Sequence, residues 1–502
     1  MMKRTISFEL FDYPHTGQNL FNILSYVFQT FKIENKIFSI SLDNASNNTN
    51  AVGLLKIRYA PIMDGAFYHS RCMAHIINLA VQDGLNIPSV QIFHEAFKLM
   101  LKDIFKSNKR RHALYRKLCQ DTNSRYLGPN WDVPNRWNST HHMFACAVRQ
   151  KETLKLFHDH LASKGKVVQF PESYWEAISE LAEFLQVFKT ATTLLSGTYY
   201  PTSPIVLQQV AFMSETIDNF SLKSDMFMEV TTAIKLKFQK YLLDVPSVFT
   251  CSAALNPCYN TLGVDTLIDQ INDNLCLYEE NPHWGPLMKT KFENDFKSLY
   301  EHYNEKYGNS AQHGLFQTSQ FSTRGSSSSS HDPNINLYNR MRQESVKRQR
   351  GNTPTSEYGR YTGTDFLSSM TPEEFATFDI LAWWKGKEQQ FPILSTMAKD
   401  LLTVQASTVA SESAFSLSGR VISLRRTKLT PTSVEMCICL KDHLDAAERI
   451  QHISSLEEPA PFELETRLHE EEVASGVADP LSDEELQSEL ATRIGEDEEY
   501  PF

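Results

Sequence analysis

The sequence predicts a small α/β layer joined to a large all-α region, with irregular segments between and after the folded parts. Near the N-terminus, short apolar runs that suit strands alternate with helical patterns, an order typical of parallel strand pairing. From residue 174 to about residue 303, apolar residues recur every three or four positions, which favours helices. The last 46 residues are acidic and poor in aromatic residues, so we expect them to be disordered.

The net charge of −11 is unevenly distributed along the 502 residues. Residues 457–502 contain sixteen Asp and Glu and two Arg, a local charge of −14, so the remaining chain carries +3. Eight scattered cysteines are typical of a reducing compartment rather than of a disulfide scaffold. No apolar run approaches the ~20 residues that span a bilayer, and the N-terminus lacks the apolar run of a signal peptide.

The α/β layer is expected to begin with a strand over residues 5–11 and a helix over residues 18–32. Residues 37–43 form the next apolar run, which ends on Asp43 and is followed by an Asn- and Ser-rich helix start. A carboxylate at the carboxyl end of a strand is a common position for metal or phosphate chemistry in α/β folds. Asp43 could instead cap the helix predicted over residues 48–58, and both interpretations remain open.

A third strand-like run, over residues 67–73, leads into Cys72 and His75. Their spacing suits zinc, but a structural zinc site needs four ligands. The sequence offers no second close pair with complementary spacing, since Cys437 and Cys439 are distant and lie in a helical pattern. We therefore expect Cys72 and His75 to shape the site beside Asp43 as a half-buried pair.

Two further groups could contact DNA. Lys109, Arg110 and Arg111 belong to a basic run on a probable helix, which is either a solvated face or a phosphate contact. Arg136 and Trp137 precede another helix, where the indole could stack on an extruded base or pack beneath the helix start.

The middle of the chain is predicted to be an all-α domain. Helical patterns cover residues 225–243, 265–277 and 288–304, and a short apolar run covers residues 249–258. A linker is expected over residues 316–364, because it contains five consecutive serines, at 326–330. The basic segment from Arg340 to Arg350 within it could be a nuclear import signal, a phosphate contact or merely solvated.

The C-terminal block contains a helix over about 392–403 and a second helix that carries Glu412. Glu412 is a lone acid among small and apolar residues, and its burial would be costly unless a cation or metal faced it. The last predicted helix starts at Pro431. One stripe of this helix, which could mediate self-association or pack on the chain's own core, contains Val434, Cys437, Ile438, Lys441 and Leu444.

Four motifs in order resemble those of the hAT-superfamily DNA transposases. They are Leu-Asp-Asn-Ala-Ser-Asn-Asn at 42–48, Arg-Cys-x-x-His-x-x-Asn-Leu at 71–79, Arg-Trp-Asn-Ser at 136–139, and the C-terminal block with Ser411 and Glu412. The chain is similar to the plant domesticated type named RICESLEEPER or DAYSLEEPER, of the zinc finger BED domain-containing family. The resemblance covers nearly everything except the acidic tail.

This resemblance implies an RNase H-like core interrupted by a large helical insertion. It also implies strand cleavage and transfer, in which three carboxylates hold two Mg²⁺ ions. Asp43 matches the second Asp of the family and Glu412 its catalytic Glu, while Cys72 and His75 match its Cys-x-x-His element. Trp137 matches the motif Trp near the transposon end. The C-terminal dimerisation element would include Val434, Cys437, Ile438 and Leu444.

Two features of the family are not found in this sequence. It has no zinc finger of the BED type and no first catalytic Asp, since Asp12 stands in a different strand context. We therefore expect a truncated core, a mixed sheet with helices, that starts at the third strand and keeps Asp43 and Glu412 as a remnant of the triad. No cofactor is expected, apart from Mg²⁺ at Asp43 and Glu412 if the chain is active.

These inferences give five expected parts: a partial RNase H-like core, an all-α insertion, a disordered linker, a dimerisation region that completes the core, and an acidic disordered tail, over residues 1–165, 166–315, 316–364, 365–450 and 451–502. The expected function is that of a DNA-binding, self-associating nuclear protein without catalytic activity. DNA and a homodimeric or heteromeric partner are expected, and no membrane. The alternatives are an active metal-dependent transposase or nuclease, and a pure dimerisation scaffold.

Overall fold

The computed structural model describes residues 3–105, 109–124, 137–163, 170–308, 337–342, 356–421 and 430–448. These residues are mostly helical, and the sheet found among them has two strands. β1 (Ile40–Leu42) and β2 (His69–Arg71) pair in parallel, with Leu42 opposite Arg71. The apolar runs at 37–43 and 67–73 predicted both strands and their parallel pairing, which is confirmed.

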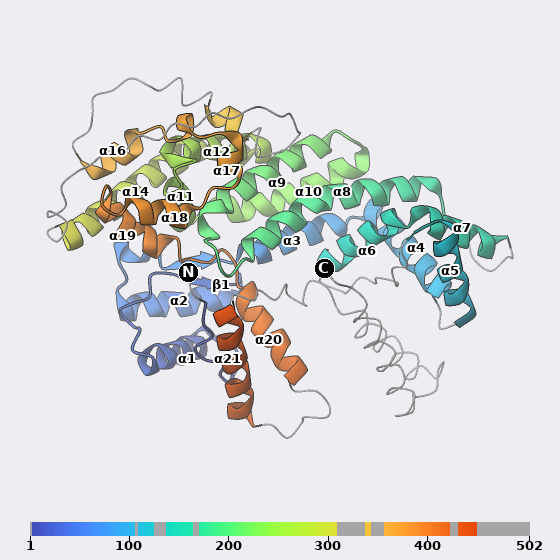
Figure 1. Cartoon of the computed structure of the whole chain (residues 1–502), viewed down its shortest axis with the longest axis horizontal. Coiled ribbons are helices and arrows are strands. Elements are labelled where there is room, and N and C mark those ends of the chain that lie inside the picture. The colour runs from blue at the N-terminus through green and yellow to red at the C-terminus, as the bar shows by residue number, and fades with distance from the viewer. Residues whose placement is uncertain are drawn as a thin grey trace.

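Two helices pack beside this sheet. α1 (Gly17–Thr30) begins at the N-cap Thr16, whose hydroxyl accepts the N–H of Asn19 at 3.2 Å. α2 (Ser46–Tyr59) follows β1, packs against α1 and encloses a small apolar core with Phe28, Leu55 and Tyr68. Figure 1 shows α1, α2 and β1 together at one side of the molecule.

The strand predicted over residues 5–11 is wrong, because this segment is irregular and pairs with no strand of the described residues. It runs instead along the last helix, α21 (Pro431–Glu448). The N–H groups of Thr5 and Phe8 donate to the carboxylates of Asp442 and Glu435, at 2.6 and 3.3 Å. Alternating residues form a strand only where a neighbouring strand accepts their backbone hydrogen bonds, and here side chains do so.

Most of the molecule is one layered helical body. α3 (Met73–Leu85) follows β2 and packs along α10 (Asp225–Leu242) and α8 (Glu172–Leu195). The other helices of this body are α4 (Pro88–Phe105), α5 (Lys109–Asp121), α6 (Trp137–Arg149), α7 (Lys151–Ala162), α9 (Val206–Ser221), α11 (Ser247–Ala254), α12 (Asn260–Leu275), α13 (Leu277–Glu280) and α14 (Trp284–Tyr307), with short 3-10 turns at Met63–Gly65 and Ser203–Ile205.

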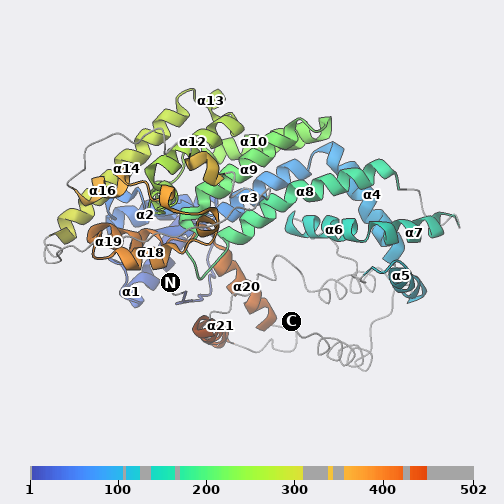
Figure 2. The same cartoon turned by 45° about the horizontal axis from the view of Figure 1, so that its top comes forward.

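The expected domain boundary at residue 165 does not coincide with a break in packing. Helices α3, α4 and α6, which lie before residue 165, contact α8, which lies after it. A single apolar core includes Phe67, Phe144, Leu185 and Leu394. In Figures 1 and 2, α4 to α7 form the end of this body that lies farthest from α14.

The C-terminal block is built into the same core. It contains α16 (Glu357–Gly363), a 3-10 turn at Leu367–Ser369, α17 (Pro372–Ala376), α18 (Ile380–Lys387) and α19 (Pro392–Leu401). The buried Tyr361 hydroxyl donates to the carbonyl of Ala254 at 2.8 Å, and the Trp384 indole donates to that of Leu255 at 2.8 Å. The side-chain amide of Asn260 donates to the Tyr361 carbonyl at 3.0 Å. These bonds fix α16 and α18 to the region around α11.

The predicted linker over 316–364 is therefore wrong for two stretches that the structure describes. Residues 337–342 are helical and bury Tyr338, while Arg340 lies 3.7 Å from Glu215. α16 buries Tyr361. Both stretches contain large aromatic residues, which supply enough apolar burial to order a polar segment. The serines at 326–330 and the acidic tail at 451–502 lie outside the described residues.

Candidate functional site

The candidate site lies where the two strands end. The C-terminal segment before α20 (Val409–Val421) covers this edge of the sheet. The Ser41 hydroxyl donates to the carbonyl of Gln405 at 2.6 Å, and the N–H of Met73 donates to that of Ala406 at 2.9 Å. Residues more than 330 positions apart in the chain therefore meet at the carboxyl ends of β1 and β2.

Asp43 stands exposed directly after β1. One oxygen, Oδ1, accepts the N–H of Ala45 at 2.9 Å and the side-chain amide of Asn48 at 2.5 Å. These bonds order the turn into α2, whose N-cap residue Ala45 offers no side-chain acceptor. The other oxygen accepts no hydrogen bond within the described part of the chain. Asp43 thus stabilises the start of α2 through Oδ1, and its other oxygen remains available to a ligand.

Glu412 lies in the first turn of α20 and is exposed. Its Oε1 accepts the hydroxyl of Thr408 at 2.8 Å. The expectation that Glu412 is buried among apolar neighbours is wrong, because α20 projects away from the helical body (Figure 1). The cost of burying a charge therefore gives no argument for a metal at this residue, and its candidacy depends on its position.

A short chain of contacts links the two acids. The N–H of Thr408 donates to the sulfur of Cys72 at 3.3 Å, and the N–H of Cys72 donates to the carbonyl of Leu42 at 2.8 Å. Thr408 also bonds Glu412, and Leu42 precedes Asp43. The fold thus places both predicted acids at the same edge of the sheet.

Cys72 connects the elements that meet at this edge of the sheet. Its side chain is fully buried, and its sulfur caps α3 by accepting the N–H of His75 at 3.4 Å. Burial raises the pKa of the Cys72 thiol, an effect that the bonds from Thr408 and His75 oppose. The protonated thiol is a poor metal ligand, since metals bind the thiolate. Cys72 thus connects β2, α3 and the segment before α20, and His75 contributes through its backbone.

The resemblance to hAT transposases implies Mg²⁺ at Asp43 and Glu412. A two-metal site needs carboxylates that surround both ions, and two exposed acids alone do not provide them. Within the described residues, no group of three His, Cys, Asp or Glu side chains is placed to hold a metal ion. The described residues therefore do not fit a complete two-metal site.

The residues predicted to contact DNA are not gathered at this edge. Trp137 is buried at the start of α6, which is the packing alternative rather than an indole available to a base. Lys109, Arg110 and Arg111 form the first turn of α5, which lies far from β1 in Figure 1. Arg136 lies outside the described residues.

The predicted dimerisation stripe on α21 points in two directions. Val434 and Ile438 are buried within this chain, whereas Cys437 and Leu444 are exposed. The predicted stripe included Leu444 but missed Met436 and Leu440, although their spacing of four residues was visible in the sequence. The outward stripe, as we define it, consists of Met436, Leu440 and Leu444, with exposed fractions of 65, 61 and 58%.

Comparison with known protein families gives three matches. Residues 360–444 match the hAT family C-terminal dimerisation region, residues 70–184 match the ZBED1 RNase-like helical domain, and residues 1–62 match the ZBED1 RNase-like domain. The boundary between the last two, near β2, agrees with the packing of α3 onto the helical body.

Curated relatives match most of the chain. An AC transposase of Zea mays is 27% identical over 89% of this chain and 54% of its own length. RICESLEEPER 2, a zinc finger BED domain-containing protein of Oryza sativa subsp. japonica, is 23% identical over 88% of this chain and 60% of its own length. A transcriptional regulator of Talaromyces stipitatus is 21% identical over 86% of this chain and 48% of its own length. The chain thus spans about half to three fifths of the length of these relatives.

Proposed function

Since the chain is a hAT-type, transposase-derived protein, we propose that it is a DNA-binding, self-associating nuclear protein that does not cleave DNA. The relatives named as transposases and as a transcriptional regulator support a role on DNA in the nucleus. We further propose that β1, β2 and the segment before α20 are the RNase H-like core implied by the family. Among the described helices, none combines the length and apolar character that crossing a bilayer requires.

The observation that best supports self-association is the outward stripe on α21. The match to the dimerisation region begins at residue 360, but α18 and α19 within it are packed on this chain's own helices. α20 and α21 instead project from the body (Figures 1 and 2). Three large apolar side chains on one helix face are typical of an interface, where burying each contributes about 1.5–3 kcal/mol.

The test measures molar mass by light scattering during size-exclusion chromatography. The wild-type chain is expected to elute as a dimer, and Leu440→Glu as a monomer, because a charge would be buried in the interface. Leu236→Glu is the matched control, since Leu236 is equally exposed but lies on α10. A monomeric wild type, or a dimer that survives Leu440→Glu, would contradict the proposal. Deleting residues 370–450 would be less informative, because it removes part of the core.

DNA binding is tested by retention at increasing salt. The body of the chain is close to neutral once the acidic tail is set aside, so binding through local basic patches should be modest and lost steeply with salt. The pure dimerisation scaffold predicts a different result, no salt-dependent retention of DNA at any concentration of protein.

The proposal that the chain does not cleave DNA is based on the surroundings of the two acids. Asp43 and Glu412 share an edge, and the described residues supply no third carboxylate beside them. The alternative is an active metal-dependent transposase or nuclease that obtains its third carboxylate from outside the described residues. Strand cleavage that requires both Asp43 and Glu412 would support this alternative.

A further inference from the structure

A cavity of about 410 Å³ lies between the strand layer and the helical body. One wall is formed by α2, the turn before β2, and β2 itself, and the opposite wall by α9 to α12 and α14. This size is within the range of small-molecule sites, which often form between two structural parts. The cavity is separate from Asp43 and Glu412, neither of which lines it.

The strand wall carries positive charge. Lys56 from α2 and Arg71 from β2 line the cavity, and neither forms an ion pair with a described residue. His69 stands two positions before Arg71 on the same strand, and its Nε2 is buried without a hydrogen-bond partner. Burial, together with the charges of Arg71 and Lys56, lowers the pKa of His69 to about 4. The imidazole is therefore neutral near pH 7 and lies near two cations that pair with no acid in the part of the chain that the structure describes.

A glycine leaves room for the Lys56 side chain beside the cavity. Gly65 has a φ of +77°, and a Cβ there would lie 2.9 Å from Cδ and Cε of Lys56. Any larger residue would therefore push the lysine stem from its present path. The backbone of this turn leaves room for the ammonium-bearing side chain beside His69.

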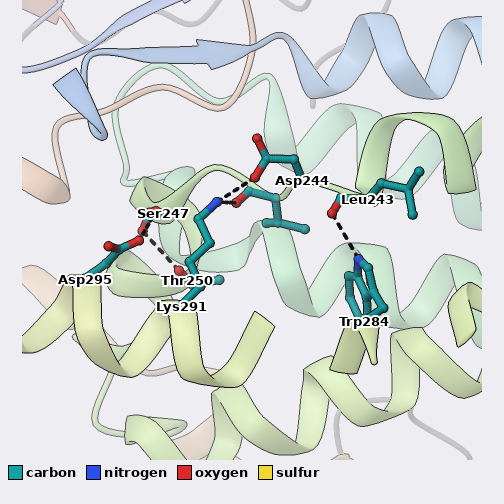
Figure 3. A network of polar contacts seen from close by, with 8 residues as sticks. Leu243, Asp244, Ser247, Thr250, Trp284, Lys291 and Asp295 are labelled. Atoms are coloured by element: carbon teal, nitrogen blue, oxygen red, sulfur yellow. Dashed lines mark hydrogen bonds and ion pairs between the residues drawn. The ribbon is translucent and has the colours of Figure 1, made fainter. Parts of the chain in front are cut away.

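The acids on the opposite wall already have partners. Lys291 Nζ lies 2.5 Å from Asp244 Oδ1, and the Ser247 hydroxyl donates to Asp295 at 2.5 Å (Figure 3). With Lys56 and Arg71 added, the charged side chains of the lining sum to +1. The excess positive charge lies on the strand wall.

Part of the cavity lining, on the helical wall, is apolar. Trp284 is buried there and donates its indole N–H to the carbonyl of Leu243 at 3.2 Å (Figure 3). Phe249, Ile268 and Met288 are buried in the same part of the lining. Tyr241 and Pro246 are half-buried and supply accessible apolar surface. A ligand that fits both parts needs an anionic group for the strand wall and a flat or apolar group for the apolar part of the helical wall.

We propose that this cavity binds a small phosphorylated molecule of the nucleoside phosphate class, with its phosphate on Lys56, His69 and Arg71. Cationic side chains and a neutral imidazole donor are suited to phosphate oxygens. The nucleoside part lies against Tyr241 and Pro246, two lining residues that are half-buried and therefore accessible from the cavity. Binding here depends on neither self-association nor DNA binding.

Isothermal titration calorimetry of the full chain with adenosine monophosphate tests the proposal, with adenosine and inorganic phosphate as comparison probes. We expect the monophosphate to bind at least about tenfold more tightly than either comparison probe, because each offers one part of the recognition. Arg71→Gln should weaken binding about tenfold or more, and so should Lys56→Gln. Lys36→Ala, at an exposed lysine of the same layer, should leave it unchanged.

Both glutamine variants keep most of the side chain, and an unchanged far-ultraviolet circular dichroism spectrum and melting temperature show that they fold. Equal binding by wild type and both variants would overturn the proposal. So would adenosine binding as tightly as the monophosphate, or no heat with any probe. Tighter binding of a single-stranded oligonucleotide, with no binding of the monophosphate, would also overturn it, because the ligand would then be nucleic acid.

Discussion

Replacing Cys72 tests whether this residue connects neighbouring structural elements or binds a metal ion. Its sulfur accepts the N–H of His75, which caps α3, and the N–H of Thr408, which precedes α20. Loss of an N-cap acceptor costs about 0.5–2 kcal/mol, and a buried N–H left without a partner costs about 1–3 kcal/mol. Bonds to sulfur are weak, so we expect Cys72→Ala to lower the free energy of unfolding by about 2 kcal/mol.

Cys72→Ser should be less destabilising than Cys72→Ala, because a serine hydroxyl is a good N-cap acceptor. The assay is urea unfolding of the full chain, followed by hydrogen exchange of residues 406–412, which should become faster in Cys72→Ala. Cys437→Ala is the control, since Cys437 is exposed, and its stability should change by no more than about 0.5 kcal/mol. If Cys72→Ala were as stable as the wild type, the structural role of Cys72 would be refuted. Binding of one zinc ion per chain by the wild type, lost in both Cys72 variants, would also refute it.

Three further outcomes follow from the packing. Tyr361→Phe removes a buried hydroxyl that donates to Ala254 and should lower the free energy of unfolding by about 1–2 kcal/mol in urea titrations. Asp442 is buried, yet the Lys3 ammonium at 2.6 Å and the bond from Thr5 hold its pKa below the usual value. Its contribution to stability is thus present above its unfolded pKa and lost as pH falls through the folded value, so Asp442→Asn should flatten the fall in melting temperature between about pH 5 and about pH 3. Trp137→Ala should destabilise the fold by about 3–5 kcal/mol, which calorimetry would detect.

Local sequence features predicted the helices well. α10 was expected over residues 225–243 and is found over Asp225–Leu242, because its apolar spacing is bounded by the N-cap Ser224 and by Pro246. The strand ends and Asp43 were equally visible, since an apolar run stops at a polar helix start. In these places the local preference and the final fold agree.

The failures arise where long-range contacts decide. The alternation of residues 5–11 resembles a strand, but these residues meet the side chains of α21. The neighbours of Glu412 in sequence are small and apolar, yet α20 projects from the body and leaves the acid exposed. Tyr361 lies in a polar segment whose burial depends on Ala254, more than 100 residues earlier. None of these partners can be identified from local spacing.

The most direct test of the central proposal is strand cleavage in vitro with Mg²⁺ or Mn²⁺. Wild type, Asp43→Ala and Glu412→Ala are compared on DNA that the wild-type chain retains at low salt. The proposed function predicts retention by all three proteins and no cleavage above background by any of them. Cleavage by the wild type that both substitutions abolish would contradict it, and would show that the two acids belong to a working metal site.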